Sequence, residues 1–360
     1  MRLYIKENNM IDYATILDQH LKILKNLQYD SGLFAASSKS VSTGYDKSWL
    51  RDNFYECLAF HVLGDNATVE KTYDALLRIL LKHEAKIDHA IHHKPIFRHE
   101  YIHARFHPET FEEFWEEWGN KQNDSIGAIL YQIGELEVKK PGSLLEGESQ
   151  IRIVNKLIKY LASIEYWHDQ DSGMWEENEE VHASSVGAVL AGLISVKRIK
   201  SLEVPDYLIE RGKEALNELL PRESQGKFVD LAQLSLIYPY NVVDDEMRTR
   251  ILEHLEYHLL RERGVIRYKN DYYYNKNPDG YSEEAEWTFG LAWLSIIYQK
   301  LGDQEKAKFF LDKLINLDTI QGMPELYFSN SDDYNENTPL GWAESLFIIA
   351  LYEINKKIIA

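Results

Sequence analysis

Apolar residues recur at helical spacing along almost the whole sequence. They fall at positions i, i+3, i+4 and i+7, which places them on one face of an α-helix. Glycine or proline separates most of the segments with this pattern, as at Gly64, Pro205 and Gly302. Twelve helices are therefore predicted, and no strand-rich segment is expected. The expected bounds are 11–27, 51–63, 67–85, 123–137, 148–166, 181–199, 206–220, 229–238, 244–262, 282–301, 304–317 and 339–356.

The predicted helices are of two kinds, and the two kinds alternate. The segments 67–85 and 244–262 carry one apolar stripe and a charged back, as expected of a helix with one face in water. The segments 181–199 and 339–356 are apolar or small nearly all round, which suits helices with neighbours on both sides. Strict alternation of six inner and six outer helices predicts an all-α fold, an (α/α)6 toroid that forms one domain over residues 1–360.

An open helical solenoid is the competing architecture. Its repeats would recur at a fixed period of roughly 34 to 45 residues, and the sequence has no such period. The loops before the second, fourth, tenth and twelfth predicted helices are long and rich in Trp, Tyr, Asn and Asp. Long ordered loops in a compact fold are usually functional, so we expect the site to be built from them.

The charge of the chain narrows the classes of partner. A formal net charge of −18 repels phosphate backbones and anionic lipid heads, so neither nucleic acid nor a membrane is an expected partner. No run approaches the roughly 18 apolar residues that a membrane span needs, and the first residues lack the layout of a signal peptide. Cys57 is the only cysteine, so no internal disulfide is possible. A cytoplasmic location is expected, and the oligomeric state is left open.

Clusters of polar and aromatic residues lie before, or at the start of, five of the predicted inner helices. In an alternating toroid all inner helices run in the same direction, so their N-termini meet at one end of the barrel. Clusters that are far apart in the sequence are therefore expected to converge on one pocket. The clusters are 44–53, 114–124, 173–180, 281–287 and 322–327.

The expected pocket is rich in carboxylates and aromatic rings. Glycosidic bond cleavage needs paired carboxylic groups, because one acid protonates the leaving oxygen while another carboxylate activates water. Aromatic rings suit sugars, whose C–H faces stack on them. This reaction needs no metal and no cofactor. The expected pocket residues are Asp52, Asp124, Glu176, Glu177, Glu286 and Glu325, beside Arg51, Arg267, Tyr45, Trp49, Trp118 and Trp175.

Simpler interpretations exist for the same residues. A glutamate taken alone, such as Glu176, is usually a solvated surface charge. Arg51 and Asp52 are also consistent with an ion pair at a helix start, which on a surface contributes ~0–1 kcal/mol. Phe114 and Trp115 are interpreted as core residues. The ordered set of clusters favours the pocket, since roles in a site belong to a constellation of residues.

Several short motifs occur in a fixed order along the chain. They are Trp-Leu-Arg-Asp at 49–52 after Tyr45, Trp-Gly-x-x-Gln-x-Asp at 118–124, Trp-Glu-Glu at 175–177, Gly-x-x-Arg-Tyr at 264–268, and Pro-Glu-Leu-Tyr at 324–327 before Pro-Leu-x-Trp at 339–342. Their order and spacing resemble glycoside hydrolase family 15 from the first helix to Trp342. The stretches 103–107, 182–187, 284–287 and 324–327 are more similar still to the glucoamylase-like domain of phosphorylase kinase alpha and beta subunits.

The resemblance implies an exo-acting, inverting hydrolase that releases β-glucose from non-reducing α-glucosidic ends of oligo- or disaccharides. It implies that Glu176 is the general acid and Glu325 the general base. In an inverting enzyme their carboxyl groups would lie roughly 6.5–9.5 Å apart, which leaves room for one water. The substrate-binding residues that it implies, together with those of the expected pocket, are Tyr45, Trp49, Arg51, Asp52, Trp118, Gln122, Asp124, Trp175, Glu177, Arg267, Glu286 and Trp342.

The histidines between His83 and His107 raise the alternative of a metal site. The usual ligand spacing with supporting Cys or carboxylates is missing, so no metal is expected. The resemblance instead favours a loop over the cleft, with His103 or His107 near the sugar.

Four alternatives remain open at this level. The base segment at 323–327 and Asn120 both depart from typical glucoamylases, so a short α-glucoside and a polymer are both possible substrates. Transfer to phosphate in place of water is also possible. A third alternative is a regulatory protein related to phosphorylase kinase subunits, which would bind a glucan or oligosaccharide without turnover. A fourth is a helical scaffold for a protein partner, which would need an exposed apolar groove.

Overall fold

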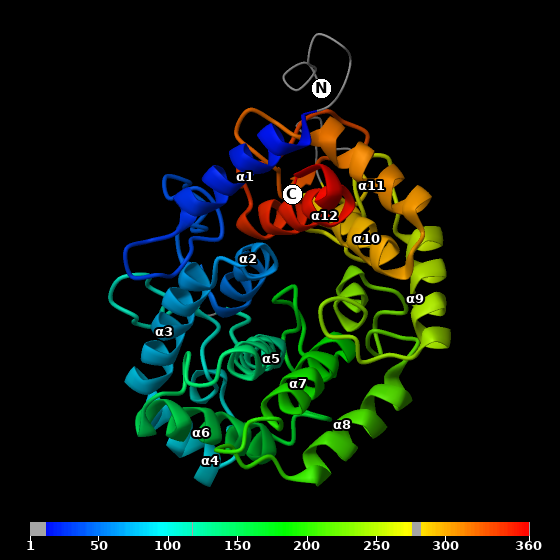
Figure 1. Cartoon of the computed structure of the whole chain (residues 1–360). Coiled ribbons are helices and arrows are strands. Elements are labelled where there is room, and N and C mark those ends of the chain that lie inside the picture. Colours follow the sequence, from blue (N-terminus) through cyan, green and yellow to red (C-terminus); the bar gives the residue numbers. More distant parts are fainter. Residues whose placement is uncertain (1–11, 117, 276–281, 360) are drawn as a thin grey trace.

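The computed structural model describes residues 12–116, 118–275 and 282–359. Its helices form a closed ring of two layers, which confirms the predicted all-α toroid (Figure 1). The outer layer consists of α1 (Tyr13–Leu27), α3 (Asn66–Lys82), α6 (Glu148–Ile164), α8 (Asp206–Leu219), α9 (Asp245–His258) and α11 (Gln304–Leu317). The inner layer consists of α2 (Leu50–Leu63), α5 (Asn123–Lys139), α7 (Ala183–Val196), the 3-10 helix η2 (Leu231–Leu236), α10 (Thr288–Leu301) and α12 (Gly341–Ile359). The ring closes where α1 packs against α12.

Burial separates the two layers as the sequence predicts. Helix α7 is buried around nearly its whole circumference, since only Ile194 of its residues is exposed. The outer helix α9 buries only Ile251, Leu252 and Leu255. An amphipathic outer helix covers an apolar inner one, and the core fills the space between the two layers. Among the described residues, no helix is both long and apolar enough to cross a bilayer.

The observed helices differ from the expected ones in three places. The expected helix at 229–238 is the short η2, because Asp230 caps it through Ala232 N (2.8 Å) and Pro239 cannot continue it. An additional helix, α4 (Glu84–His92), follows α3 and buries Ile87 and Ala90. Helix α10 begins at Thr288, whereas its expected start at 282 lies in a non-helical segment.

Two short antiparallel ribbons, which the sequence analysis missed, lie beside the starts of inner helices. Strand β1 (Ser48–Trp49) pairs with β2 (Arg105–Phe106), and β3 (Glu286–Trp287) pairs with β4 (Leu326–Tyr327). A further short 3-10 helix, η1 (Arg98–Glu100), precedes β2. Each strand has two residues, which is too short for an alternating pattern to identify. The ribbons fix the residues that precede α2 and α10.

Glycines let the inner helices α5 and α7 approach closely. A Cβ atom at Gly127 would lie 2.4 Å from Ala188 C and Val189 N, and one at Gly192 would lie 2.4 Å from Gly127 O. These neighbours are backbone atoms, so they cannot move aside as a flexible side chain would. The spacing of the inner layer therefore depends on glycine at both positions.

Replacing Gly127 by alanine is expected to destabilise the fold. The added methyl group would force α5 away from α7, and overpacking of this kind costs about 1–3 kcal/mol. Urea unfolding followed by circular dichroism should show a lower midpoint for Gly127→Ala. The matched control is Glu210→Ala on the exposed face of α8, which should change stability by less than about 0.5 kcal/mol. An unchanged midpoint for Gly127→Ala would mean that the two helices are not held at this distance.

Candidate active site

A cavity of about 260 Å³ opens at the end of the ring where the inner helices begin. The clusters before α2, α5, α7, α10 and α12 all contribute to it, as expected from their common direction. Its volume lies just below the ~300–1,000 Å³ typical of drug-sized ligand pockets, so it suits a ligand as small as one sugar ring. The lining residues are Ala36, Tyr45, Trp49, Arg51, Asp52, Trp118, Met174, Trp175, Glu176, Glu177, Arg267, Tyr273, Trp287, Glu325, Leu340 and Trp342.

Glu176 lies in a tight loop before α7 and has an unusual backbone conformation. Its φ of 64° is in the left-handed region, which costs energy for a residue other than glycine and persists only when the surroundings impose it. The surroundings do so here: Glu176 N donates to Gly173 O (3.3 Å), and a Cβ at Gly119 would lie 2.6 Å from Glu176 O. Gly119 of the preceding cluster therefore allows this loop to lie against it.

The carboxyl group of Glu176 is 23% exposed and faces the cavity. Burial raises its pKa to about 8, although the positive charge of Arg51 lowers it. Arg51 Nη1 lies 3.6 Å from Glu176 Oε1. Burial likewise raises the pKa of the neighbouring Asp52 to about 6, again against the effect of Arg51. At neutral pH Glu176 is thus mainly protonated and able to donate a proton.

Glu325 lies immediately before β4, 1% exposed. Burial raises its pKa to about 7, while hydrogen bonds to its charged form lower it. Asn337 donates to Glu325 Oε2 (2.8 Å), Asn335 donates to the same oxygen, and Tyr45 donates to Oε1 (3.0 Å). Its pKa is therefore below that of Glu176, which is the order that a base and an acid in one site require.

Asn335, Asn337 and Tyr273 were not found by the sequence analysis. The amide of Asn337 has a fixed orientation, because Thr43 donates to its Oδ1 (2.6 Å) and leaves its Nδ2 for Glu325. Tyr273 Oη lies 2.9 Å from Tyr45 Oη. An asparagine pair in a polar loop carries no periodic or compositional signal, so only the fold reveals its role.

On the side away from the cavity, the Arg51 guanidinium donates hydrogen bonds to residues of the clusters 114–124 and 173–180. Its Nε donates to Asp124 Oδ2 (2.6 Å), and its Nη2 donates to Asp124 Oδ1 (3.1 Å), Gln122 Oε1 (2.6 Å) and Gly173 O (3.2 Å). Nη1 alone is left to face the cavity. Arg51 pairs with Asp124 and not with Asp52, which excludes the interpretation of a simple ion pair at a helix start.

A second cation, Arg267, is fixed in the same way on the other side. Its Nε and Nη2 donate to Asp271 Oδ2 and Oδ1 (both 2.6 Å), and Nη2 also donates to Glu177 Oε1 (2.9 Å). Burial works against ionisation of Glu177, but Arg267 and Lys227 outweigh it and hold the pKa of Glu177 below its usual range. Glu177 is therefore a charged acceptor that suits sugar hydroxyls.

Aromatic rings form the floor of the cavity. Trp342 stacks on Tyr55 with ring centroids 4.1 Å apart and on Phe289 at 4.7 Å, and Trp175 lies parallel to it at 6.2 Å. Trp175 Nε1 donates to Asp230 Oδ1 (2.7 Å). In contrast, the buried Nε1 groups of Trp49, Trp287 and Trp342 have no acceptor among the described residues.

Three of the expected site residues do not line the cavity. Gln122 and Asp124 lie behind Arg51 and position it. Glu286 lies elsewhere, because its Oε2 accepts a hydrogen bond from Arg263 N (2.5 Å) and so fixes the turn after α9, which lies beside β3. His103 also lies outside the cavity and packs on the far side of Trp118, at 6.0 Å between ring centroids.

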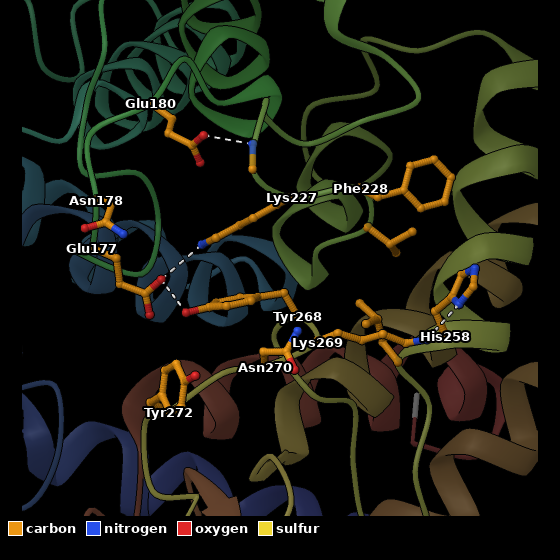
Figure 2. Close-up of a pocket in the computed structure, with 13 residues that line it drawn as sticks. Glu177, Asn178, Glu180, Lys227, Phe228, His258, Tyr268, Lys269, Asn270 and Tyr272 are labelled. Atoms are coloured by element: carbon orange, nitrogen blue, oxygen red, sulfur yellow. Dashed lines mark hydrogen bonds and ion pairs between the residues drawn. The ribbon is translucent and has the colours of Figure 1, made fainter.

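Two larger cavities adjoin the first. One, of about 670 Å³, has Glu177 in common with it, and Figure 2 shows Lys227 and Tyr268 of this cavity contacting the Glu177 carboxylate. Glu177 Oε2 accepts from Lys227 (3.0 Å) and Tyr268 (2.6 Å). The other, of about 830 Å³, has Trp118 in common with the first cavity.

Comparisons with known proteins agree with this geometry. The sequence model of Glycosyl hydrolases family 15 matches residues 13–353. The uncharacterized glycosyl hydrolase MJ1610 of Methanocaldococcus jannaschii is 24% identical over 99% of this chain and 58% of its own length. The phosphorylase b kinase regulatory subunit alpha, liver isoform, of Mus musculus is 23% identical over 94% of this chain and 32% of its own length.

A solved structure of a glycosidase variant in complex with glucose has the same fold. It matches with a TM-score of 0.79 and 18% identity over 95% of this chain and 97% of its own. The ring of paired helices, the carboxylates at one end of it and the family match over most of the sequence define a protein of the glucoamylase-like fold. The chain belongs to glycosyl hydrolases family 15, which confirms the resemblance seen in its motifs. It spans less than two thirds of the length of both named relatives, at 58% and 32%.

Removing a hydrogen-bond donor from Glu325 is expected to raise the pKa of this residue. Asn337→Ala deletes a 2.8 Å bond to the carboxylate. A hydrogen bond to a charged group contributes about 1.5–3 kcal/mol, so we expect the pKa to rise by about one to two units. The pKa is measurable by NMR titration of carbon-13-labelled glutamate, with Glu325→Gln to assign the signal. Asn217→Ala, on the exposed face of α8, should leave it unchanged. A fall in the pKa would contradict the assigned bond.

Proposed function

We propose that this protein is an inverting exo-acting hydrolase of α-glucosidic bonds, with Glu176 as general acid and Glu325 as general base. Residues 1–360 act as one catalytic barrel in this proposal. The observation that carries it is the pair of carboxyl groups, one buried and one partly buried, that line one small cavity, where desolvation brings the pKa of Glu325 to about 7 and that of Glu176 to about 8. A saccharide is the proposed substrate because aromatic rings, carboxylates and guanidinium groups all line this cavity.

The mechanism assigns one proton transfer to each acid. Glu176 donates its proton to the glycosidic oxygen as the bond to the anomeric carbon breaks, and the sugar acquires oxocarbenium character. Glu325 takes a proton from the water that attacks the opposite face of the ring, which inverts the anomeric centre. Asn335 and Asn337 both donate to Oε2 of Glu325, whereas Oε1 accepts a hydrogen bond from Tyr45 and keeps a lone pair for the water.

The charged side chains around the two acids hold the terminal sugar. Arg51 Nη1, Asp52 and Glu177 face the cavity with unused hydrogen-bonding capacity, and charge-assisted bonds to hydroxyls are the strong ones. Trp49, Trp118, Trp175 and Trp342 supply faces for stacking. The cavity is small enough to hold one sugar ring, and two partly desolvated acids line it. This arrangement favours cleavage at a chain end.

Substitution of either acid is expected to abolish turnover while the protein stays folded. Glu176→Gln and Glu325→Gln should each lower kcat by about 10²–10⁴-fold, because each removes one proton transfer. Released sugar is followed by proton NMR on maltose, isomaltose, trehalose and longer glucans, and the first product should be β-glucose. Repeating the assay with phosphate separates hydrolysis from phosphorolysis, which would yield a sugar phosphate. Release of α-glucose would refute inversion.

The pH profile provides an independent test of the two roles. Below about 7 Glu325 is protonated and cannot accept a proton, and above about 8 Glu176 is ionised and cannot donate one. The profile of kcat/KM should therefore be bell-shaped with its maximum between these two values. With α-glucosyl fluoride, whose leaving group needs no protonation, the alkaline limb should weaken and the acidic limb should remain. An alkaline limb that persists with the fluoride would assign the two carboxyl groups to other roles.

A second candidate function is sugar binding without turnover. The similarity to a regulatory subunit of phosphorylase b kinase favours it. Titration calorimetry with glucose and malto-oligosaccharides distinguishes the two, because a binding protein would take up the sugars and leave them intact over days. Two carboxyl groups with raised pKa values that line one cavity favour the enzyme, since perturbed acids of this kind cluster at catalytic sites.

A further inference from the structure

A buried group of charged side chains lies where the ring closes. His20 of α1 is 1% exposed, and its Nδ1 lies 2.6 Å from Glu344 Oε2 in the first turn of α12. Its Nε2 lies 3.4 Å from Oδ2 of Asp318, the residue that follows α11. Burial alone would lower the pKa of His20, but Glu344 and Asp318 outweigh it and raise the pKa to about 10. At neutral pH the imidazole is therefore a cation between two carboxyl groups.

Closing the ring does not by itself require charges at this place. Apolar side chains of similar volume often stabilise a buried contact as well as an ion pair does, because the ions lose their hydration on burial. The side chains of His20, Asp318 and Glu344 line none of the three cavities described above. A role for these charges in the site therefore has to act through another residue.

Glu344 binds the backbone of the segment that carries Glu325. Its Oε2 faces His20, and its Oε1 accepts a hydrogen bond from Met323 N (2.6 Å), two residues before Glu325. Gly322 lies against the same oxygen, since a Cβ atom there would clash with Glu344 Oε1. The φ of Gly322, 110°, also favours glycine. His20 thus determines which oxygen of Glu344 is left for the Met323 peptide.

The backbone around Glu325 is held from two inner helices. Thr288 N of α10 donates to Glu325 O (3.2 Å), whereas Glu344 of α12 accepts from Met323 N. The Glu344 contact is the stronger type, because hydrogen bonds to a charged group exceed those between neutral groups. Without it, a shift of this segment would carry the Glu325 carboxyl group away from its donors in the loop at 335–337.

We propose that Glu344 and His20 are positioning residues for Glu325. Glu344 holds the Met323 peptide, and His20 holds Glu344 in the orientation that this bond needs. Neither side chain touches a ligand or a reacting atom, and both act through the backbone that carries Glu325. The inference rests on the proposed function only for the role of Glu325 as base, since the environment of this carboxyl group is measurable without turnover.

Three variants of the full chain separate positioning from stability. Glu344→Ala removes the acceptor of the Met323 N–H, whereas Glu344→Gln keeps an amide oxygen at the same place. Glu344→Ala also leaves His20 as an unpaired buried cation, so this variant alone is at risk of unfolding. The triple variant His20→Leu, Glu344→Leu, Asp318→Asn replaces the charges by apolar and neutral side chains. It should remain about as stable as the unchanged chain while lacking the acceptor for Met323.

Carbon-13 NMR titration measures the pKa of Glu325, and urea unfolding measures stability. The pKa should rise by about 0.5–1 unit in Glu344→Ala and in the triple variant, because a displaced carboxyl group loses hydrogen bonds to its charged form while it stays buried. Glu344→Gln should return the pKa toward that of the unchanged chain. The acidic limb of kcat/KM should move by the same amount, with kcat lowered about 10–100-fold and KM changed less than about twofold.

Glu137 supplies a matched control at the C-terminal end of α5. It is 6% exposed, and its carboxylate accepts from Gly142 N (2.8 Å), Leu144 N (2.6 Å) and Leu145 N (2.9 Å). Glu137→Ala should lower the unfolding midpoint and leave the pKa of Glu325 and the pH profile unchanged. An equal change in the Glu325 pKa with Glu137→Ala would overturn the proposal, because loss of stability alone would then explain the effect.

Positioning and turnover fail separately in this design. A raised pKa of Glu325 in the folded triple variant, with no α-glucoside hydrolysed by the unchanged chain, supports the positioning role and rejects the proposed enzyme. Hydrolysis by the unchanged chain, with the same kcat, pH profile and Glu325 pKa in the folded triple variant, rejects the positioning role and supports the enzyme.

Discussion

The ion pair between Arg51 and Asp124 connects the elements at the end of the helix ring where the small cavity lies. Both side chains are 2% exposed, and the guanidinium also binds Gln122 and the Gly173 carbonyl. It thereby joins the N-termini of α2 and α5 to the loop that presents Glu176. Loss of one partner of a buried pair costs about 3–5 kcal/mol, because the other charge is left uncompensated. The direction of the inner helices brings the clusters to one end, and this contact fixes their positions there.

The two candidate acids share a cavity but have different environments. Burial raises the pKa of both, and what opposes it differs: a guanidinium beside Glu176, and neutral amide and phenol donors around Glu325. Three donors fix the orientation of Glu325, whereas the position of Glu176 comes from its strained backbone and the close approach of Gly119. Side-chain contacts thus orient Glu325, while the backbone orients Glu176.

The sequence predicted most of the layered fold and much of the site. Helical periodicity depends on burial along one face, which is why α7 and α12 were identified as inner helices. It failed at η2, where Pro239 limits the helix, and at the two-residue strands. Motifs located Glu176 and Glu325, but Asn337 was missed because its partner lies 12 residues away in a loop whose shape depends on the closed ring. Trp115 was misassigned because hydrophobicity alone does not reveal which way a loop residue points.

The indole N–H groups of Trp49, Trp287 and Trp342 are buried and lack acceptors among the described residues, although all three line the cavity. A buried donor without an acceptor costs about 1–3 kcal/mol, so the fold tolerates a local deficit at three rings around the cavity. Sites with such unmet donors reject ligands by what those ligands lack, which is a stricter filter than size or shape.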